Sequence, residues 1–254
     1  MTSGARPGAP DGAPLAELAG LGAFFAVASH DPRSALAGPW RPLEELTGSA
    51  VAVADRIGAV RSALAAAAGC GAQAVEFRVA ASVTQLGIAA RLIAPALGMA
   101  VVCGAVPDVA AAWWQPALGG AFPLSLPIGG ASWPGAGRDE AGALAAGLGG
   151  HVVDGPVRLV TEVVAAMSVP PAVLWGNVAS AVNGAASMIA TARPGLAARA
   201  QAVSSALLRR PPLAGTYAGA PVAGFRRRSC CLIYRLSPAS APAFCGDCIL
   251  LDRI

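Results

Sequence analysis

Apolar side chains recur every three to four residues along most of the chain, which is the spacing that gathers them on one face of an α-helix. This pattern predicts helices over Leu15–Ser29, Ser49–Ala67, Gln73–Gly98, His151–Met167, Ser168 to about Thr191, and Pro194–Arg210. Ser168 is expected to cap its helix, because Pro170 and Pro171 follow in the first turn. Pro95 is expected to kink or end the third helix.

Two stretches interrupt the helical pattern. Residues 116–137 hold four prolines and six glycines, which excludes a long helix there. Within them, Phe122–Leu126 alternates as a strand does, and Met99–Val106 is apolar enough for either a short strand or a helix. We therefore predict a disordered tail over residues 1–14, an N-terminal helical half over 15–115, a C-terminal helical half over 116–212, and a cysteine-bearing segment over 213–254.

The cysteine-bearing segment has a different pattern. Cys231–Tyr234 and Cys245–Leu251 each suit a short strand, and a polar, proline-containing turn separates them. An isolated hairpin is marginal in water, so this one must lean on the helices. The predicted fold class is mainly α with a small β component, and the expected hairpin carries the cysteines.

The composition of the chain bears on the cellular compartment in which we expect the protein. The chain of 254 residues is 55% hydrophobic, which suffices for a substantial core. Its first residues show no secretory signal. The best candidate span, Leu92–Val106, is shorter than the roughly 20 apolar residues that cross a bilayer, so we interpret it as a buried core segment. We expect a cytoplasmic protein without a transmembrane span, in a reducing compartment where clustered cysteines bind metal rather than pair as disulfides.

Four cysteines fall within nineteen residues: Cys230 and Cys231 are adjacent, thirteen residues follow, and Cys245 and Cys248 close the set. Structural zinc sites commonly use two Cys-x-x-Cys pairs, whereas this chain has one such pair and one vicinal pair. A vicinal pair fits more easily around a larger two-iron cluster held by four thiolates. Spacing alone favours iron–sulfur but leaves open zinc and a thiol or disulfide role.

The stretch Arg227-Arg228-Ser229-Cys230-Cys231-Leu232-Ile233-Tyr234-Arg235, followed by Cys245-Gly246-Asp247-Cys248, resembles the C-terminal signature of the ferric-siderophore reductases. Leu174–Ser180 and Val79–Leu97 are similar to helices of that family. The resemblance implies that the four cysteines hold one [2Fe–2S] cluster and carry the electron transfer. It also implies a cytoplasmic reductase that removes iron from imported siderophores, which we expect to be of the hydroxamate type.

The surroundings of the cysteines suggest residues for substrate. Arg227, Arg228 and Arg235 would offset the charge of the thiolates and attract an anionic siderophore or an acidic donor such as a ferredoxin. Trp175 and Asn177, one turn into their helix, are further candidates for substrate contact. The sequence has no nicotinamide or flavin fingerprint, so electrons must come from an external donor. Peripheral contact with the inner face of the cell membrane is compatible with this interpretation.

Two other function classes stay open. A pure electron carrier would have the same cluster, although it needs far less protein than this helical body. A zinc-stabilised binding module for nucleic acid is disfavoured by a net charge of only +4 and 5% aromatic residues. Outside the cluster, we expect Cys70 and Cys103 to be buried thiols.

Overall fold

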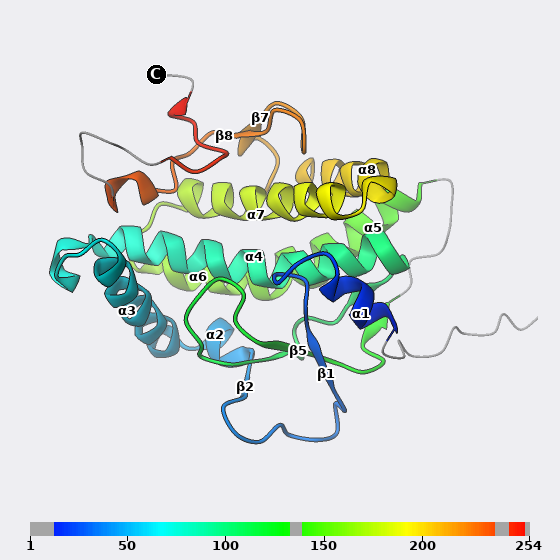
Figure 1. Cartoon of the computed structure of the whole chain (residues 1–254), viewed down its shortest axis with the longest axis horizontal. Helices are drawn as coiled ribbons and strands as arrows, with labels where there is room; N and C mark the ends of the chain where they lie inside the picture. The colour runs from blue at the N-terminus through cyan, green and yellow to red at the C-terminus, as the bar shows by residue number, and fades with distance from the viewer. Residues whose placement is uncertain (1–12, 133–138, 237–243, 252–254) are drawn as a thin grey trace, which may run out of the picture.

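The structure, a computed structural model of the chain, describes residues 13–132, 139–236 and 244–251. Helices make up most of it, and the cysteine-bearing segment lies across one side of the helical body (Figure 1). The predicted class, mainly α with a small β component, is confirmed. The predicted tail over residues 1–14 falls almost entirely outside the described residues, as does most of the turn between the two cysteine pairs.

The helices follow the apolar pattern of the sequence in most places. Their bounds are α1 Ala13–Ala19, α2 Glu44–Gly48, α3 Ala50–Ala67, α4 Phe77–Cys103, α5 Glu140–Leu148, α6 Arg158–Ala166, α7 Pro171–Ala192 and α8 Ala197–Leu208. Short 3-10 turns lie at η1 Ala72–Ala74, η3 Pro194–Leu196 and η4 Ile233–Leu236, and π-helical turns form η2 Gly149–Val157.

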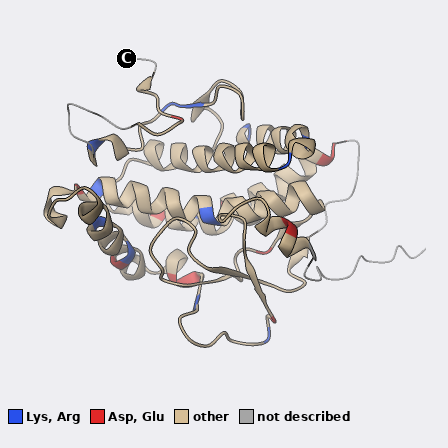
Figure 2. Cartoon of the chain, in the orientation of Figure 1, with Lys and Arg blue, Asp and Glu red and all other residues tan. Residues whose placement is uncertain are grey.

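Helices α4 and α7 form the centre of the body and run side by side (Figure 1). Helix α3 and helix α6 pack on α4, while α8 packs on α7 and α5 on α8. Few charged residues lie on the two central helices (Figure 2). Helix α4 continues through Pro95 to Cys103, so Pro95 does not end it and Met99–Cys103 is helical. Gly104 then stops the helix in a left-handed conformation, φ 69°.

The strands are short and form small sheets, and the largest of these lies on the side of the body opposite the cysteine-bearing segment (Figure 1). The strands are β1 Ala28–His30, β2 Arg41–Pro42, β3 Val106–Pro107, β4 Trp113–Trp114, β5 Leu124–Pro127, β6 Ala131–Ser132, β7 Tyr217–Ala218 and β8 Arg226–Arg227. Strands β1, β5, β4 and β2 form one sheet in that order, with β1 parallel to β5 and the other pairs antiparallel. Strand β5 confirms the strand predicted around Phe122–Leu126.

Two predictions about helix ends are wrong, and in each case a nearby residue has a positive φ. The helix predicted over Leu15–Ser29 ends at Ala19, because Gly22 turns the chain with φ 124°. Ser168 adopts φ 70° and does not cap α7, whose N-cap is Pro170. Ser49 does cap α3, since its Oγ accepts the Ala52 amide at 3.2 Å.

The C-terminal hairpin is present, but it is not formed by the predicted strands. It pairs β7 with β8 upstream of all four cysteines, with Ala218 opposite Arg226. Ile233–Leu236 is the 3-10 turn η4, and the described residues from Phe244 to Leu251 form turns. The strand predictions for Cys231–Tyr234 and Cys245–Leu251 are therefore wrong.

One described helix, α4, is long and apolar enough to cross a membrane by length and composition. This is weak evidence for a span, because 72% of its most apolar window is buried inside the protein. A buried core helix passes the same test, as the sequence led us to expect for Leu92–Val106.

Candidate metal centre

The four C-terminal cysteines come together on the side of the body formed by α4 and α7. The sulfurs of Cys231 and Cys245 lie 3.5 Å apart, which joins the vicinal pair to the Cys-x-x-Cys pair. Cys231 and Cys248 are each 2% exposed, whereas Cys230 and Cys245 are half-buried. One edge of the thiol group therefore faces the protein and the other faces solvent.

Two backbone amides point at sulfur. The Leu232 amide donates to Cys230 Sγ at 3.3 Å and the Leu250 amide donates to Cys248 Sγ at 3.4 Å. Leu232 adopts φ 72°, a left-handed conformation that costs free energy in a leucine. This turn directly after the vicinal pair brings the Leu232 amide to Cys230 Sγ.

The thiol acidities differ within the group. A hydrogen bond with Cys245 lowers the pKa of Cys231 to about 6, and the charge of Arg227 acts in the same direction. The same hydrogen bond raises the pKa of Cys245, and burial raises that of Cys230. One proton shared between Cys231 and Cys245 explains the opposite shifts, because the thiol of one stabilises the thiolate of the other.

A buried polar network in the helical body supports the first cysteine pair. Ser82 of α4 donates from Oγ to the Cys231 carbonyl at 2.9 Å. Asn177 of α7 donates from Nδ2 to the Ser82 carbonyl at 3.0 Å and to Gln85 Oε1 at 2.9 Å. Gln85 donates in turn to Thr161 Oγ1 at 3.0 Å. These contacts fix the Cys231 backbone to the two central helices.

Asp247 anchors the second pair. It stands between Cys245 and Cys248, and its carboxylate accepts from Ser180 Oγ at 2.5 Å and from Asn183 Nδ2 at 3.4 Å, both on α7. Its carbonyl accepts the Arg227 amide at 3.0 Å. The first cysteine pair is thus held by Ser82 of α4, and the second pair is held through Asp247 by Ser180 and Asn183 of α7.

Arg227 is 1% exposed and lies under the thiols. Its Nη2 donates to Asn177 Oδ1 and, at 3.3 Å, to the Val173 carbonyl. Among the described residues its Nε and Nη1 have no hydrogen-bond partner, and neither has Ser229 Oγ, although all three atoms are buried. A side chain at Gly176 would place its Cβ 2.1 Å from Ser229 Oγ, so the Ser229 hydroxyl would have to move away from its present position.

The donor set fits an iron–sulfur cluster. Four thiols can supply the four thiolate ligands of a [2Fe–2S] centre. Unpaired buried donors on Arg227 and Ser229 beside them are what an anionic group with bridging sulfides would satisfy. Among the described residues no three histidine, cysteine or acidic side chains gather tightly enough to hold one metal ion.

Two of the predicted substrate residues need correction. Asn177 is 0% exposed and Arg227 is 1% exposed, so neither side chain reaches a substrate in solution. Their hydrogen bonds place them as supports of the cysteine segment. Sequence reasoning placed Arg227 among the substrate contacts because its run of arginines lies directly before the first cysteine pair, and only the packing of β8 against α7 shows that it is buried.

The other three candidates lie nearer solvent. Arg228 is exposed and Trp175 is half-buried beneath the Arg158 guanidinium, 5.3 Å from its ring centre. Arg235 donates to Glu76 at 2.7 Å, which ties η4 to the start of α4. These hydrogen bonds lower the pKa of Glu76, chiefly the one from Arg235 and then the one from Arg78. Their role in substrate contact stays a prediction.

Residues outside the site also differ from expectation. Cys70 is exposed, so its prediction as a buried thiol is wrong, and Cys103 is half-buried. His30 lies on β1 and bonds Ser125 Oγ at 2.9 Å, away from the cysteines. His151 lies in the π-helical turns of η2.

The supporting residues Ser82, Gln85, Gly176, Ser180 and Asn183 were not found from the sequence. They are small or amide side chains spaced along two apolar helices, and such residues are also common at ordinary helix contacts. Asp247 could have been found from the sequence. A carboxylate between two metal-binding cysteines is repelled by the thiolates, so hydrogen-bond donors that hold it are to be expected.

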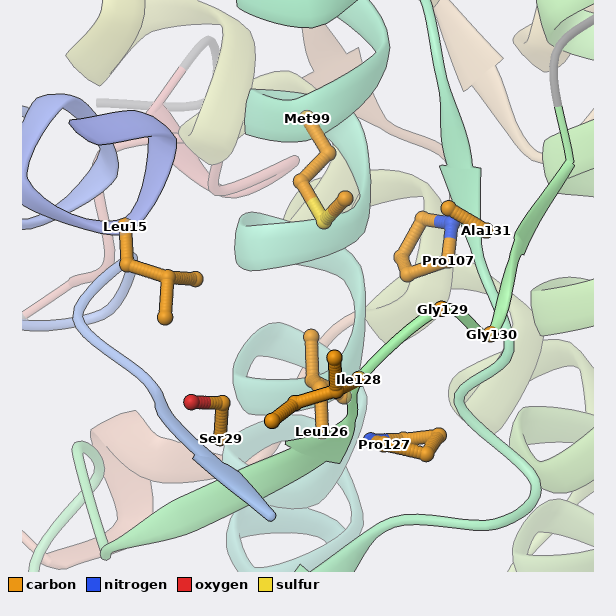
Figure 3. A pocket seen from close by; sticks show the side chains of 10 residues that line it. All are labelled: Leu15, Ser29, Met99, Pro107, Leu126, Pro127, Ile128, Gly129, Gly130 and Ala131. Atoms are coloured by element: carbon orange, nitrogen blue, oxygen red, sulfur yellow. The ribbon is translucent and has the colours of Figure 1, made fainter. Parts of the chain in front are cut away.

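A small pocket between β1, β5 and α4 is lined by apolar side chains such as Leu15, Met99 and Ile128 (Figure 3). Its volume is about 30 Å³, room for about one water molecule. Among the residues that the structure describes, its lining includes no charged side chain and none of the four cysteines. This pocket therefore is not a substrate site.

Residues 227–248 match the family model described as the FhuF 2Fe-2S C-terminal domain. The matched range contains all four cysteines, so the cofactor predicted from them, a [2Fe–2S] cluster, is confirmed. Comparison with curated proteins and with solved structures found no match.

Proposed function

We propose that this chain, whose residues 227–248 match the FhuF 2Fe-2S C-terminal domain, reduces the Fe(III) of an imported siderophore by one electron. The match supports a C-terminal domain that holds a 2Fe-2S cluster, and it is consistent with a role in siderophore-iron metabolism. The reductase activity, the substrate and the partners are our inference from the site.

The observation that carries the proposal is the uneven burial of the four thiols. Cys231 and Cys248 are buried, while Cys230 and Cys245 are only half-buried. When bound, a [2Fe–2S] cluster supplies one-electron transfer at this place. An outer edge within reach of solvent suits exchange with a bulky partner that does not enter the protein.

The charge around that edge favours an anionic partner. Arg228 is exposed beside the first cysteine pair, and Arg235 lies on η4 with its charge shared by Glu76. Figure 2 shows basic residues on β8 and on η4, on either side of the cysteine-bearing loop. A ferric complex with acidic groups and an acidic donor such as a ferredoxin would both be drawn to this edge.

The reaction also has a chemical reason. Hydroxamate and catecholate oxygens hold Fe(III) much more strongly than Fe(II), because the more highly charged ion gains more from anionic oxygens. Transfer of one electron oxidises the protein and gives Fe(II), which the ligand releases. We place the reaction in the cytoplasm, at or near the inner face of the membrane where an imported complex arrives, and we favour a hydroxamate substrate.

The test is a single-turnover reaction without oxygen. Reduced, cluster-loaded protein is mixed with a ferric trihydroxamate in the presence of a colorimetric Fe(II) chelator. We expect one Fe(II) captured per cluster oxidised, and a slower reaction for Arg228→Gln at low ionic strength. The Cys231→Ser variant, in which one ligand is lost, should neither bleach nor release iron.

Two results would replace the proposal. A protein that transfers electrons to a ferredoxin but never accelerates Fe(II) release from a hydroxamate or catecholate complex would be an electron carrier. A colourless protein with one zinc per chain would be a zinc-stabilised module.

A further inference from the structure

Arg56 of α3 is a buried arginine without a counter-ion. Its side chain is only 8% exposed. Its guanidinium lies 4.5 Å from the ring centre of Phe122 and 5.2 Å from that of Trp114. Nη1 donates to the Ala117 carbonyl at 3.3 Å, and Arg56 makes no ion pair within the part of the chain that the structure describes.

Arg91 shows how this fold satisfies a buried arginine that has only a structural role. Its Nε donates to Phe122 O at 2.6 Å, Nη1 to Phe24 O at 2.7 Å and Nη2 to Ala26 O at 2.6 Å. A guanidinium has five N–H groups, and those of Arg91 donate to three backbone carbonyls. Among the described residues Arg56 donates to one carbonyl, so the other N–H groups of its guanidinium have no protein partner there.

A cavity of about 240 Å³ opens beside Arg56, between α3, α4 and the loop after β4. Its walls are apolar and include Val60, Leu64, Val83 and Leu118. Thr84 also lines it, but its hydroxyl donates within its own helix to the Ala80 carbonyl at 2.8 Å. Among the described residues that line this cavity, Arg56 is therefore the one with a charge.

Gly87 keeps the cavity open. It lies inside α4, where glycine weakens a helix relative to alanine. No packing contact demands it, because a Cβ at this position would meet no atom within 4 Å. This differs from Gly98 on the same helix, whose Cβ would come within 2.8 Å of Leu18. Gly87 therefore leaves space in the cavity that a larger side chain at this position would occupy.

We propose that this cavity binds a small carboxylate with an apolar body, whose carboxylate pairs with Arg56 and whose hydrocarbon part packs between α3 and α4. A planar guanidinium with free N–H groups matches a carboxylate bidentately. The volume is below the range of about 300–1,000 Å³ typical of pockets for drug-sized ligands, which points to a medium-chain acid rather than a larger one. Burial lowers the pKa of Arg56 because it disfavours the charged guanidinium, and an anion paired with Arg56 would offset this cost.

A second cavity, of about 260 Å³, touches Arg56 from its other side. It is lined by Arg41 and Asp55 as well, so it has charges of both signs. Arg41 lies 3.6 Å from Glu45. A carboxylate gains less there, since Asp55 would repel it, and the apolar cavity is the better site.

The proposed site is separate from the cysteines. Ser82 faces Cys231, whereas Val83, Thr84 and Gly87 follow it at about 100°, 200° and 140° around the helix axis. The two sites therefore lie on different sides of α4. Binding of the acid need not involve the cluster, and failure of either proposal can be seen without the other.

Isothermal titration of cluster-loaded protein with octanoate tests the site, with octan-1-ol as the neutral probe of equal length. We expect one octanoate per chain and binding of the alcohol at least tenfold weaker. The Arg56→Met variant should lose at least tenfold in affinity. Arg61→Met is the matched control on the same helix, because the Arg61 guanidinium donates to the Val75 and Gln73 carbonyls and not into the cavity.

A second pair of variants leaves Arg56 in place. Gly87→Leu should fill the cavity and abolish octanoate binding, with the visible spectrum of the cluster unchanged. Gly58→Leu adds the same side chain at an exposed glycine of α3 that has nothing within 4 Å, and it should bind as the wild type does. Unchanged octanoate binding by Gly87→Leu, equal binding of the alcohol, or no binding by the wild type would each overturn the proposal.

Discussion

Replacing Arg227 should shift the reduction potential of the protein. Its guanidinium is buried, two of its nitrogens are unpaired among the described residues, and its charge acts to lower the pKa of Cys230, Cys231 and Cys245. A fixed positive charge stabilises the more negative of two states. Arg227 should therefore favour the reduced form of the centre over the oxidised one, and its loss should make the potential more negative.

The size of the shift follows from Coulomb's law. A unit charge at about 5–8 Å in a medium of effective dielectric constant about 20 contributes about 2–3 kcal/mol. For one electron, a tenfold change in the ratio of reduced to oxidised protein corresponds to about 59 mV. Allowing for relaxation around the missing side chain, we expect Arg227→Gln to lower the midpoint potential by about 60–140 mV.

The assay is an anaerobic redox titration followed in the visible, together with the electron paramagnetic resonance spectrum of the reduced protein. Arg227→Lys keeps the charge but loses the fork that bonds Asn177, so its potential should move by less than half as much. Arg228→Gln is the matched control, because it removes the same charge from the adjacent, exposed residue, where water screens it. A midpoint for Arg227→Gln equal to the wild-type value, with the cluster fully loaded, would refute the electrostatic role.

Three further outcomes are expected. Gly176→Ala should lower iron content by displacing the Ser229 hydroxyl beside the thiols, whereas Gly184→Ala on the same helix, with open space at its Cβ, should leave iron content near wild type. Glu76→Gln should destabilise the protein only at higher pH. The folded-state pKa of Glu76 lies below its usual 4.5, so its contribution to stability is present above pH 4.5 and is lost as the pH falls through the folded-state pKa. Urea melts should therefore separate wild type and variant at pH 7 and bring them together at pH 3.5. Burial lowers the pKa of His30 below 6.5, so stability should fall as pH drops below that value, and His30→Gln should flatten this part of a stability–pH profile measured by tryptophan fluorescence.

The sequence predicts the central helices because their signals are local. Apolar periodicity defines α3, α4 and α7, and Ser49 caps α3 as its position before an apolar run suggests. The cluster is likewise readable, because four thiols within nineteen residues are typical of a metal centre in a reducing compartment. In both cases the residues that decide the outcome are neighbours along the chain.

The errors arise where distant segments meet. Arg227 was expected to contact substrate, but α7 buries it. Arg56 is buried in part by the loop after β4, to which it donates a hydrogen bond, and no local pattern shows this. The strand predicted over Cys231–Tyr234 is absent because Leu232 takes a left-handed turn that brings its amide to Cys230 Sγ. No local propensity favours that conformation in leucine. It is fixed by the cysteine arrangement, which involves residues thirteen positions further on.

The helical body and the cysteine-bearing segment depend on each other physically. The segment has strands of two residues and little core of its own, so an isolated piece would not order four thiols. Ser82 and Asn177 hold the first cysteine pair on α4 and α7, and Ser180 and Asn183 hold the second through Asp247. In return, Arg227 and Ser229 leave buried donors unpaired at the interface, a cost that is removed only when an acceptor arrives. Because the bound cluster stabilises the state in which both halves of this contact are formed, loading of the cluster should raise the melting temperature of α4 and α7 as well as that of the segment that ligates it.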